Sequence, residues 1–233
     1  MALPPQTDDA FLREVDEELR REQFGNIWRR YGRLILAGVV IALAVFGGYL
    51  WWQAEREKAA GADGEKMIAA LEAIGQGRAV EGQKTLGELA GGKNEGYRAI
   101  AKLALAARKL EQGDSKGASA DYASIAGDQN LAQPFRDLAL LRGTAAEFDT
   151  MKPEIAIERL KPLAVPGNPW FGSASEMTAV AWLQRGRVDK AGALFGAIAK
   201  DPKVPESIRA RATRLAGALG IDAEAAIAAP VKE

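Results

Sequence analysis

Hydrophobic residues along the chain form two patterns. Between Leu34 and Trp52 no residue is charged, and apolar side chains would surround a helix on every side. From residue 53 to about residue 219, apolar residues recur three or four positions apart, with Gly, Pro and Asp between the runs. This is the periodicity of amphipathic helices, and no run alternates as a strand does. The pattern predicts an all-α protein, in which one apolar helix precedes a helical domain.

The uncharged stretch has the length and the flanks of a transmembrane helix. At about 1.5 Å per residue it nearly spans a hydrocarbon core of about 30 Å. Aromatic rings that favour the membrane interface stand near both ends: Trp28, Tyr31, Tyr49, Trp51 and Trp52. A buried core helix would normally show a polar face. We therefore predict a single membrane span from Leu34 to Trp52.

Basic residues are more frequent before this stretch than after it. Within 14 residues of its ends, those before it are Arg20, Arg21, Arg29, Arg30 and Arg33, and those after it are Arg56, Lys58 and Lys66. Lys and Arg near a span favour the cytoplasmic side, so Arg29, Arg30 and Arg33 predict a cytoplasmic N-terminus and an exported C-terminal domain. A cleavable signal peptide, cut at residues 60–62, is the alternative. The charged leader of more than thirty residues favours an uncleaved anchor.

The predicted organisation has four parts. Residues 1–33 form a cytoplasmic leader with a short amphipathic helix that begins at Asp8 and is interrupted at Gly25 and Asn26. This helix either lies near the membrane or docks onto a partner. The span covers residues 34–52, the helical domain covers residues 53–220, and residues 221–233 form a disordered tail.

One motif recurs within the helical domain: a small residue, then a larger apolar residue four positions later. Its four copies are Gly82 and Leu86, Ala118 and Tyr122, Ala156 and Leu160, and Ala191 and Phe195. The steps between copies are 36, 38 and 35 residues, close to the 34-residue tetratricopeptide unit. The small residue would let two helices approach, and the larger one would fill the space between pairs. Because one helix pair cannot bury its apolar face alone, the pairs are expected to stack.

Three glycines mark the turn inside a helix pair. Gly77, Gly113 and Gly186 each stand five residues before a motif, where a helix end commonly needs glycine. The first helices of the four pairs are then expected at about 66–74, 97–110, 135–148 and 170–184. A last helix at about 206–219 closes the array. The turn of the third pair, near residues 150–153, is irregular.

The first helices offer candidate residues for a partner-binding groove: Tyr97, Lys102, Arg136 and Trp170. Trp170 and Phe171 follow a turn with the sequence VPGN. They either pack into the core or form the edge of a partner site.

Composition excludes several kinds of chemistry. The chain has no cysteine and no histidine, so thiolate, iron–sulfur and Ser–His catalysis are excluded and the usual zinc ligands are missing. The net charge is zero, without the basic patch of a nucleic-acid-binding protein. Gly87, Gly92 and Lys93 match a phosphate-binding loop, but Asn94 stands where Ser or Thr is needed. We expect no enzyme activity, no cofactor, no metal and no small-molecule substrate.

Longer blocks of the sequence resemble the YfgM-like family of ancillary translocon subunits. They include the leader DDAFLREVDEELRREQ, the entry WRRYG, the span ending GGYLWW, and the blocks YRAIAKLALAARKLEQGD, PFRDLALLRGTAAEFD and PLAVPGNPWFGSASE. The resemblance implies a single-pass protein of the bacterial inner membrane with a tetratricopeptide-like domain in the periplasm. It also implies that the SecYEG channel and periplasmic chaperones are the partners. No catalytic residue is carried over.

Two other roles fit the same architecture. The chain could serve as a scaffold for cell-envelope or cell-division machinery, or as an assembly factor for a membrane enzyme. All three roles describe a membrane-anchored adaptor for protein–protein interaction, and they differ in the partner.

Overall fold

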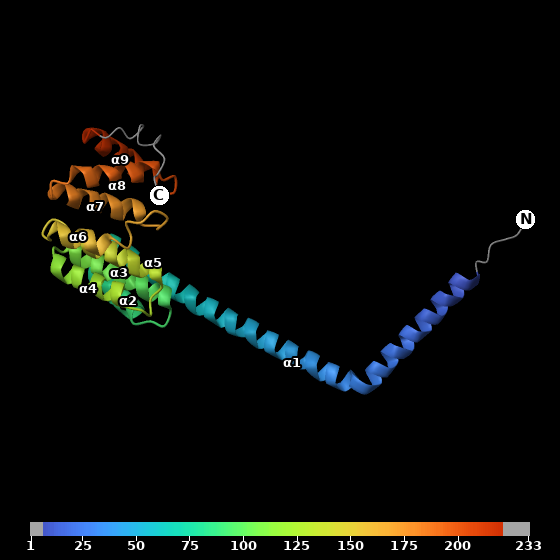
Figure 1. The fold of residues 1–233 in the computed structure, drawn as a ribbon. Coiled ribbons are helices and arrows are strands. Elements are labelled where there is room, and N and C mark those ends of the chain that lie inside the picture. The colour runs from blue at the N-terminus through green and yellow to red at the C-terminus, as the bar shows by residue number, and fades with distance from the viewer. Residues whose placement is uncertain (1–6, 221–233) are drawn as a thin grey trace, which may run out of the picture. The chain divides into compact units, whose positions relative to one another are not determined.

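The computed structural model describes residues 7–220, with side chains described from residue 30 on. Within this range the chain forms nine helices and no strand (Figure 1), which confirms the predicted all-α fold class. The helices are α1 (Thr7–Gly75), α2 (Ala79–Ala90), α3 (Glu95–Glu111), α4 (Ser115–Gly127), α5 (Gln133–Glu147), α6 (Pro153–Leu160), α7 (Phe171–Gln184), α8 (Val188–Lys200) and α9 (Glu206–Ala218).

The chain divides into two units, residues 1–61 and residues 62–233. Helix α1 contributes to both, because it runs unbroken from Thr7 to Gly75. The expected interruption at Gly25 and Asn26 is therefore absent. A single glycine in a helix costs only about 1 kcal/mol, and no proline lies within α1 to end it. The predicted disordered tail, residues 221–233, lies outside the described residues.

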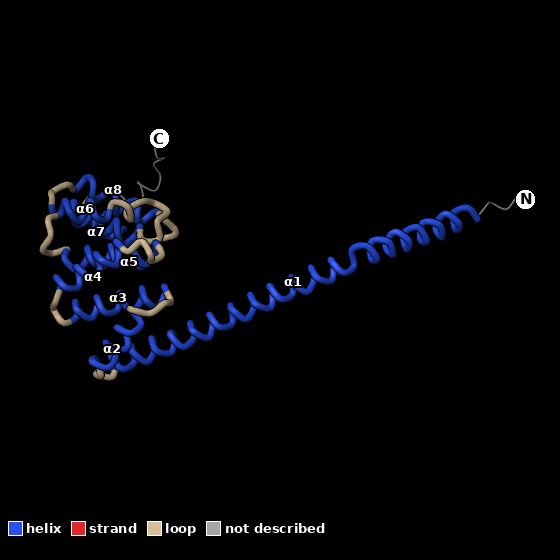
Figure 2. The backbone as a smooth tube through the Cα atoms, turned by 90° about the horizontal axis from the view of Figure 1, so that it is seen from below, coloured by secondary structure: helices blue, strands red, loops and turns tan. Residues whose placement is uncertain are grey.

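In the second unit each helix from α2 to α9 packs against the next one along the chain. Figure 2 turns the molecule by 90° and shows the helices connected by short loops. Helix α3 also contacts α5, and α7 also contacts α9. The first helices α3 and α5 of two neighbouring pairs therefore contact each other, and the closing helix α9 contacts α7, as in a stacked repeat array.

Local sequence sets the ends of these helices. Gly77, Gly113 and Gly186 have φ of 82°, 85° and 69°, which L residues with a side chain rarely adopt. The third pair has no such glycine; instead α6 starts at Pro153, where the missing N–H of proline costs nothing. Asn94 caps α3 by accepting hydrogen bonds from the backbone N–H groups of residues 96 and 97. The glycine-rich segment before it is thus a loop between helices.

The core consists of four separate clusters, one at each junction along the array. They are centred on Leu86 and Leu89, on Tyr122 and Ile125, on Leu160 and Leu163, and on Phe195 and Ile198. The predicted repeat-packing residues are all buried in the structure: Gly82, Leu86, Ala118, Tyr122, Ala156, Leu160, Ala191 and Phe195. Stability in such an array comes from contacts between neighbouring repeats.

The apolar stretch belongs to the first unit and is exposed all along its length. Leu34 is 69% exposed, Val45 is 68% exposed and Trp52 is 52% exposed. Among the described residues, one helical segment, Arg30–Gly75, contains a window that is long and apolar enough to cross a membrane. This finding rests on length and composition alone.

Candidate functional site

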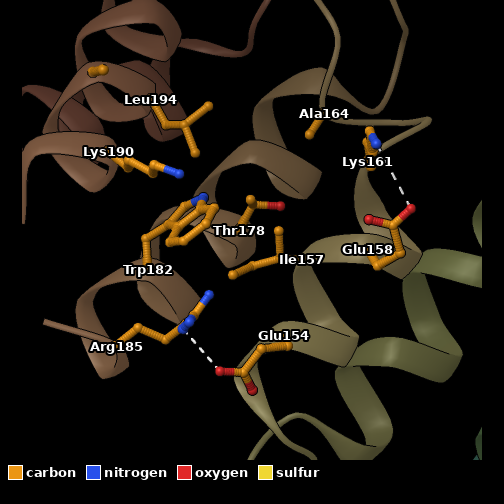
Figure 3. Close-up of a pocket in the computed structure, with 11 residues that line it drawn as sticks. Glu154, Ile157, Glu158, Lys161, Ala164, Thr178, Trp182, Arg185, Lys190 and Leu194 are labelled. Atoms are coloured by element: carbon orange, nitrogen blue, oxygen red, sulfur yellow. Dashed lines mark ion pairs between the residues drawn. The ribbon is translucent and has the colours of Figure 1, made fainter. Parts of the chain in front are cut away.

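A hollow of about 620 Å³ lies between α6, α7 and α8 (Figure 3). We name it the Trp182 hollow. Its lining residues are Glu154, Ile157, Glu158, Lys161, Ala164, Thr178, Trp182, Arg185, Lys190, Ala193 and Leu194. In Figure 3 the Trp182 ring faces Ile157 across the hollow, and Leu194 closes the side of α8. Ligand pockets typically enclose about 300–1,000 Å³, so this space can accept large side chains.

Two cations flank the indole ring of Trp182. The Lys190 Nζ atom lies 4.0 Å from the ring centroid, and the Arg185 guanidinium carbon lies 5.5 Å from it. Trp182 comes from α7, whereas Lys190 comes from the first turn of α8. Attraction between a cation and an aromatic ring, worth about 0.5–1 kcal/mol at an exposed site, helps to hold the ring in place.

Carboxylates neutralise two of the three cations around the hollow. Arg185 Nε lies 2.8 Å from Glu154 Oε1, which links α7 to α6. Lys161 Nζ lies 3.7 Å from Glu158 Oε1. Lys190 has no carboxylate within 4.0 Å in the part of the chain that the structure describes.

The acidic residue nearest to Lys190 in sequence is occupied elsewhere. Asp189 accepts two hydrogen bonds from the Arg187 guanidinium, at 3.0 and 2.7 Å. These bonds lower the pKa of Asp189 from 3.8 to about 2. Asp189 is therefore ionised at neutral pH and paired with Arg187 rather than with Lys190.

A second, smaller hollow of about 350 Å³ lies between α4, α5 and α6. Its α4 wall and the α6 wall of the first hollow are formed by the same positions of the repeat. Counted from the small residue of the motif, these are positions −2, +1, +2, +5 and +8. From Ala118 these are Lys116, Ser119, Ala120, Ala123 and Ala126, and from Ala156 they are Glu154, Ile157, Glu158, Lys161 and Ala164. Two successive repeats thus form a hollow at the same positions of the motif.

The side chains of the second hollow differ from those of the first. Small residues line its α4 wall, and Arg159 Nη1 lies 2.9 Å from Glu147 Oε2 across it. The guanidinium of Arg159, followed by the hydroxyl of Ser119, lowers the pKa of Glu147. This ion pair ties α5 to α6.

The structure places the four predicted groove residues in different surroundings. Tyr97 packs beside the Leu86 cluster, and its hydroxyl lies close to Gly64 on α1. Lys102 pairs with Asp128 at 3.2 Å. Arg136 donates hydrogen bonds to Gln129 and Gln133. Trp170 is half-buried against the Leu160 cluster. That these residues bind a partner stays a prediction.

Of the two aromatic residues after the VPGN turn, Phe171 is 2% exposed and belongs to the Phe195 cluster. Trp170 packs against the neighbouring cluster. Both rings therefore pack on the core, the first of the two alternatives, although Trp170 keeps a part of its surface exposed.

Sequence reasoning missed Trp182 and Lys190. The register of the motif could have identified the α6 wall, because the same five positions recur in two repeats.

Among the described residues, no group of three or more Asp or Glu side chains is placed to hold a metal ion. The arrangement is suited to binding apolar and charged groups together.

Comparison with known families gave one match. A family model described as a tetratricopeptide repeat-like domain matches residues 26–214. The matched region includes the apolar stretch as well as the helix pairs. Searches of the curated proteins and of the solved structures found no match. The family match covers most of the chain, which therefore belongs to the tetratricopeptide repeat-like domain family.

Proposed function

We propose that this protein is a membrane-anchored adaptor, with its tetratricopeptide-like domain in the periplasm of a bacterium. The observation that carries the proposal is the exposed apolar stretch directly before the repeat domain, with both inside one family match. Tetratricopeptide-like domains are protein-interaction modules, since stacked repeats offer an extended binding surface. An anchor on such a module keeps its partners at the membrane.

The ends of the stretch support a membrane location. The Arg30 guanidinium lies 5.7 Å from the centre of the Tyr31 ring, and that of Arg56 lies 4.4 Å from the centre of the Trp52 ring. Aromatic rings and basic side chains both favour the interface between lipid and water. The spacing of these pairs matches a helix that crosses the bilayer once, with Leu34 and Trp52 at its ends.

We further propose that the adaptor is an ancillary subunit of the SecYEG translocon, which links emerging chains to periplasmic chaperones. The support is the resemblance of the leader, the span and the repeat blocks to the YfgM-like family. Scaffolding of envelope or division machinery, and assembly of a membrane enzyme, are the competing roles.

In-membrane photocrosslinking tests this proposal. A photoreactive amino acid is placed at Val39 or Val45 in the span, or at Trp170 in the domain, and the adducts are identified. We expect adducts from the span to channel subunits, and from Trp170 to chaperones or emerging chains. The control carries the probe at Arg214, on the exposed side of α9. Adducts to division or enzyme-assembly proteins alone would reject the translocon role and leave the anchored adaptor.

A further inference from the structure

We propose that the Trp182 hollow binds a segment of a partner protein in which a bulky apolar side chain stands next to a carboxylate. This inference rests on the proposed function only in taking a protein as the ligand. The proposed binding face lies between α6, α7 and α8, and the proposed ligand combines an apolar and an acidic side chain.

The interior of the hollow selects an apolar side chain. Ile157 and Leu194 line opposite sides of it, and the edge of Trp182 lies between them (Figure 3). The hydroxyl of Thr178 does not offer its proton to a polar ligand group, because it donates a hydrogen bond to the carbonyl oxygen of Ala174 at 2.8 Å. Burial of an apolar side chain here would favour binding, because it removes apolar surface from water.

The charge around the hollow selects an acidic neighbour for that side chain. Glu154 and Glu158 already neutralise Arg185 and Lys161. Asp189 is held by Arg187. Among the residues that the structure describes, Lys190 is the cation of this hollow with no carboxylate within 4.0 Å, and it lies over the Trp182 ring. A carboxylate on the ligand would pair with Lys190, whereas a ligand lysine at the same place would be repelled.

The experiment uses the full chain in lipid nanodiscs and a displayed library of random 16-residue peptides. Selected peptides are then synthesised with a fluorescent label, and their binding is measured by anisotropy. We expect enrichment of Leu, Phe or Trp next to Asp or Glu. Ala193→Trp, which fills the hollow from α8, should weaken binding at least tenfold. Ala120→Trp, which fills the second hollow from its α4 wall, should change binding less than twofold.

Charge reversal supplies the second arm. Lys190→Glu should weaken binding of the acidic peptides at least tenfold, and it should strengthen binding of the same peptides with Lys in place of Asp or Glu. Lys116→Glu, in the second hollow, is the matched control. Lys190 and Ala193 are exposed, and circular dichroism of each variant checks that its helices are retained.

Three results would overturn the inference: no peptide is selected, the selected peptides lack acidic residues, or they bind Ala193→Trp as well as the unaltered chain. Such failure leaves the crosslinking result at Val39 and Val45 untouched. Conversely, the two experiments can give opposite results. If the hollow selects these peptides but the chain does not crosslink to the channel, the inference stands and the translocon role is rejected.

Discussion

A Cβ atom added to Gly82 would lie 2.5 Å from the carbonyl oxygen of Ala70 and 2.6 Å from Cγ1 of Ile74. Helix α2 therefore approaches the end of α1 so closely that only glycine fits without movement. The neighbouring Gly87, on the same helix, has open space around its added Cβ. The two positions separate the effect of close packing from the effect of helix propensity.

We predict that Gly82→Ala destabilises the contact between α1 and α2 by about 1–3 kcal/mol, because added atoms in a packed core force a shift of the backbone. Gly87→Ala should instead stabilise α2 by about 0.5–1 kcal/mol, since alanine favours the helix. Amide hydrogen exchange of α2, measured by mass spectrometry, reports both. Equal effects of the two substitutions would contradict the close approach.

The repeated motif, a small residue followed by a larger apolar residue, shows what the sequence can predict. Gly82 and its three counterparts stand at a regular period, and a periodic small residue has one simple physical reason, which is the close approach of helices. The first helices were predicted to within two residues of α3, α5 and α7 at both ends. Gly113 and Gly186 set the C-terminal ends of α3 and α7 locally, and the apolar period sets the extent of α5.

Features that depend on distant contacts or on small energy differences could not be predicted in the same way. The continuity of α1 through Gly25 and Asn26 depends on about 1 kcal/mol of helix propensity. The Trp182 hollow depends on which side chains from α6, α7 and α8 meet, and on the pairing of Asp189 with Arg187. In the sequence alone, nothing distinguishes the charged residues around the hollow from other surface charges, or Trp182 from other aromatic residues.

The pairing of Asp189 has a measurable consequence. Its carboxyl should titrate at about 2 in the folded protein, because the Arg187 guanidinium favours the ionised form. Substitution Arg187→Ala should raise this pKa toward the ordinary value of 3.8. Carbon-13 NMR of the carboxyl group during a pH titration measures both values. A pKa of Asp189 near 3.8 in the unaltered chain would show that the pair does not form in solution.

The Glu147–Arg159 pair predicts how stability depends on pH. The folded pKa of Glu147 is lowered below 4.5, so the pair stabilises the array above that pH, and its contribution is lost as the pH falls through the folded pKa. Glu147→Gln should therefore lower stability at pH 7, by about 0.2–1 kcal/mol for a partly exposed pair. Below the folded pKa of Glu147, the variant and the unaltered chain should converge.

Urea denaturation of both chains in detergent, at several pH values between 7 and 2.5, measures this effect. Glu88→Gln is the matched control, because Glu88 is exposed and forms no ion pair within 4.0 Å in residues 30–220. A difference between Glu147→Gln and the unaltered chain that stays constant from pH 7 to pH 2.5 would mean that the substitution acts through packing rather than through charge.

The absence of cysteine allows a direct test of the proposed topology. Single-cysteine variants Gln23→Cys and Gly91→Cys place a thiol before and after the apolar stretch, with no other thiol in the chain. In intact cells with a permeable outer membrane, a maleimide that cannot cross the inner membrane should label Cys at position 91 and spare position 23. After cell lysis both positions should react.

The arginines before the apolar stretch are the basis of the proposed orientation, because basic residues near a span favour the cytoplasmic side. Changing Arg29, Arg30 and Arg33 together to Gln leaves two basic residues, Arg20 and Arg21, within 14 residues before the apolar stretch and three within 14 residues after it. Labelling at position 23 of intact cells should then rise and labelling at position 91 should fall. Changing Arg56 and Lys58 to Gln is the matched control and should leave the pattern as it was. Equal labelling of both positions in intact cells, before any arginine is changed, would mean that the apolar stretch does not cross the membrane.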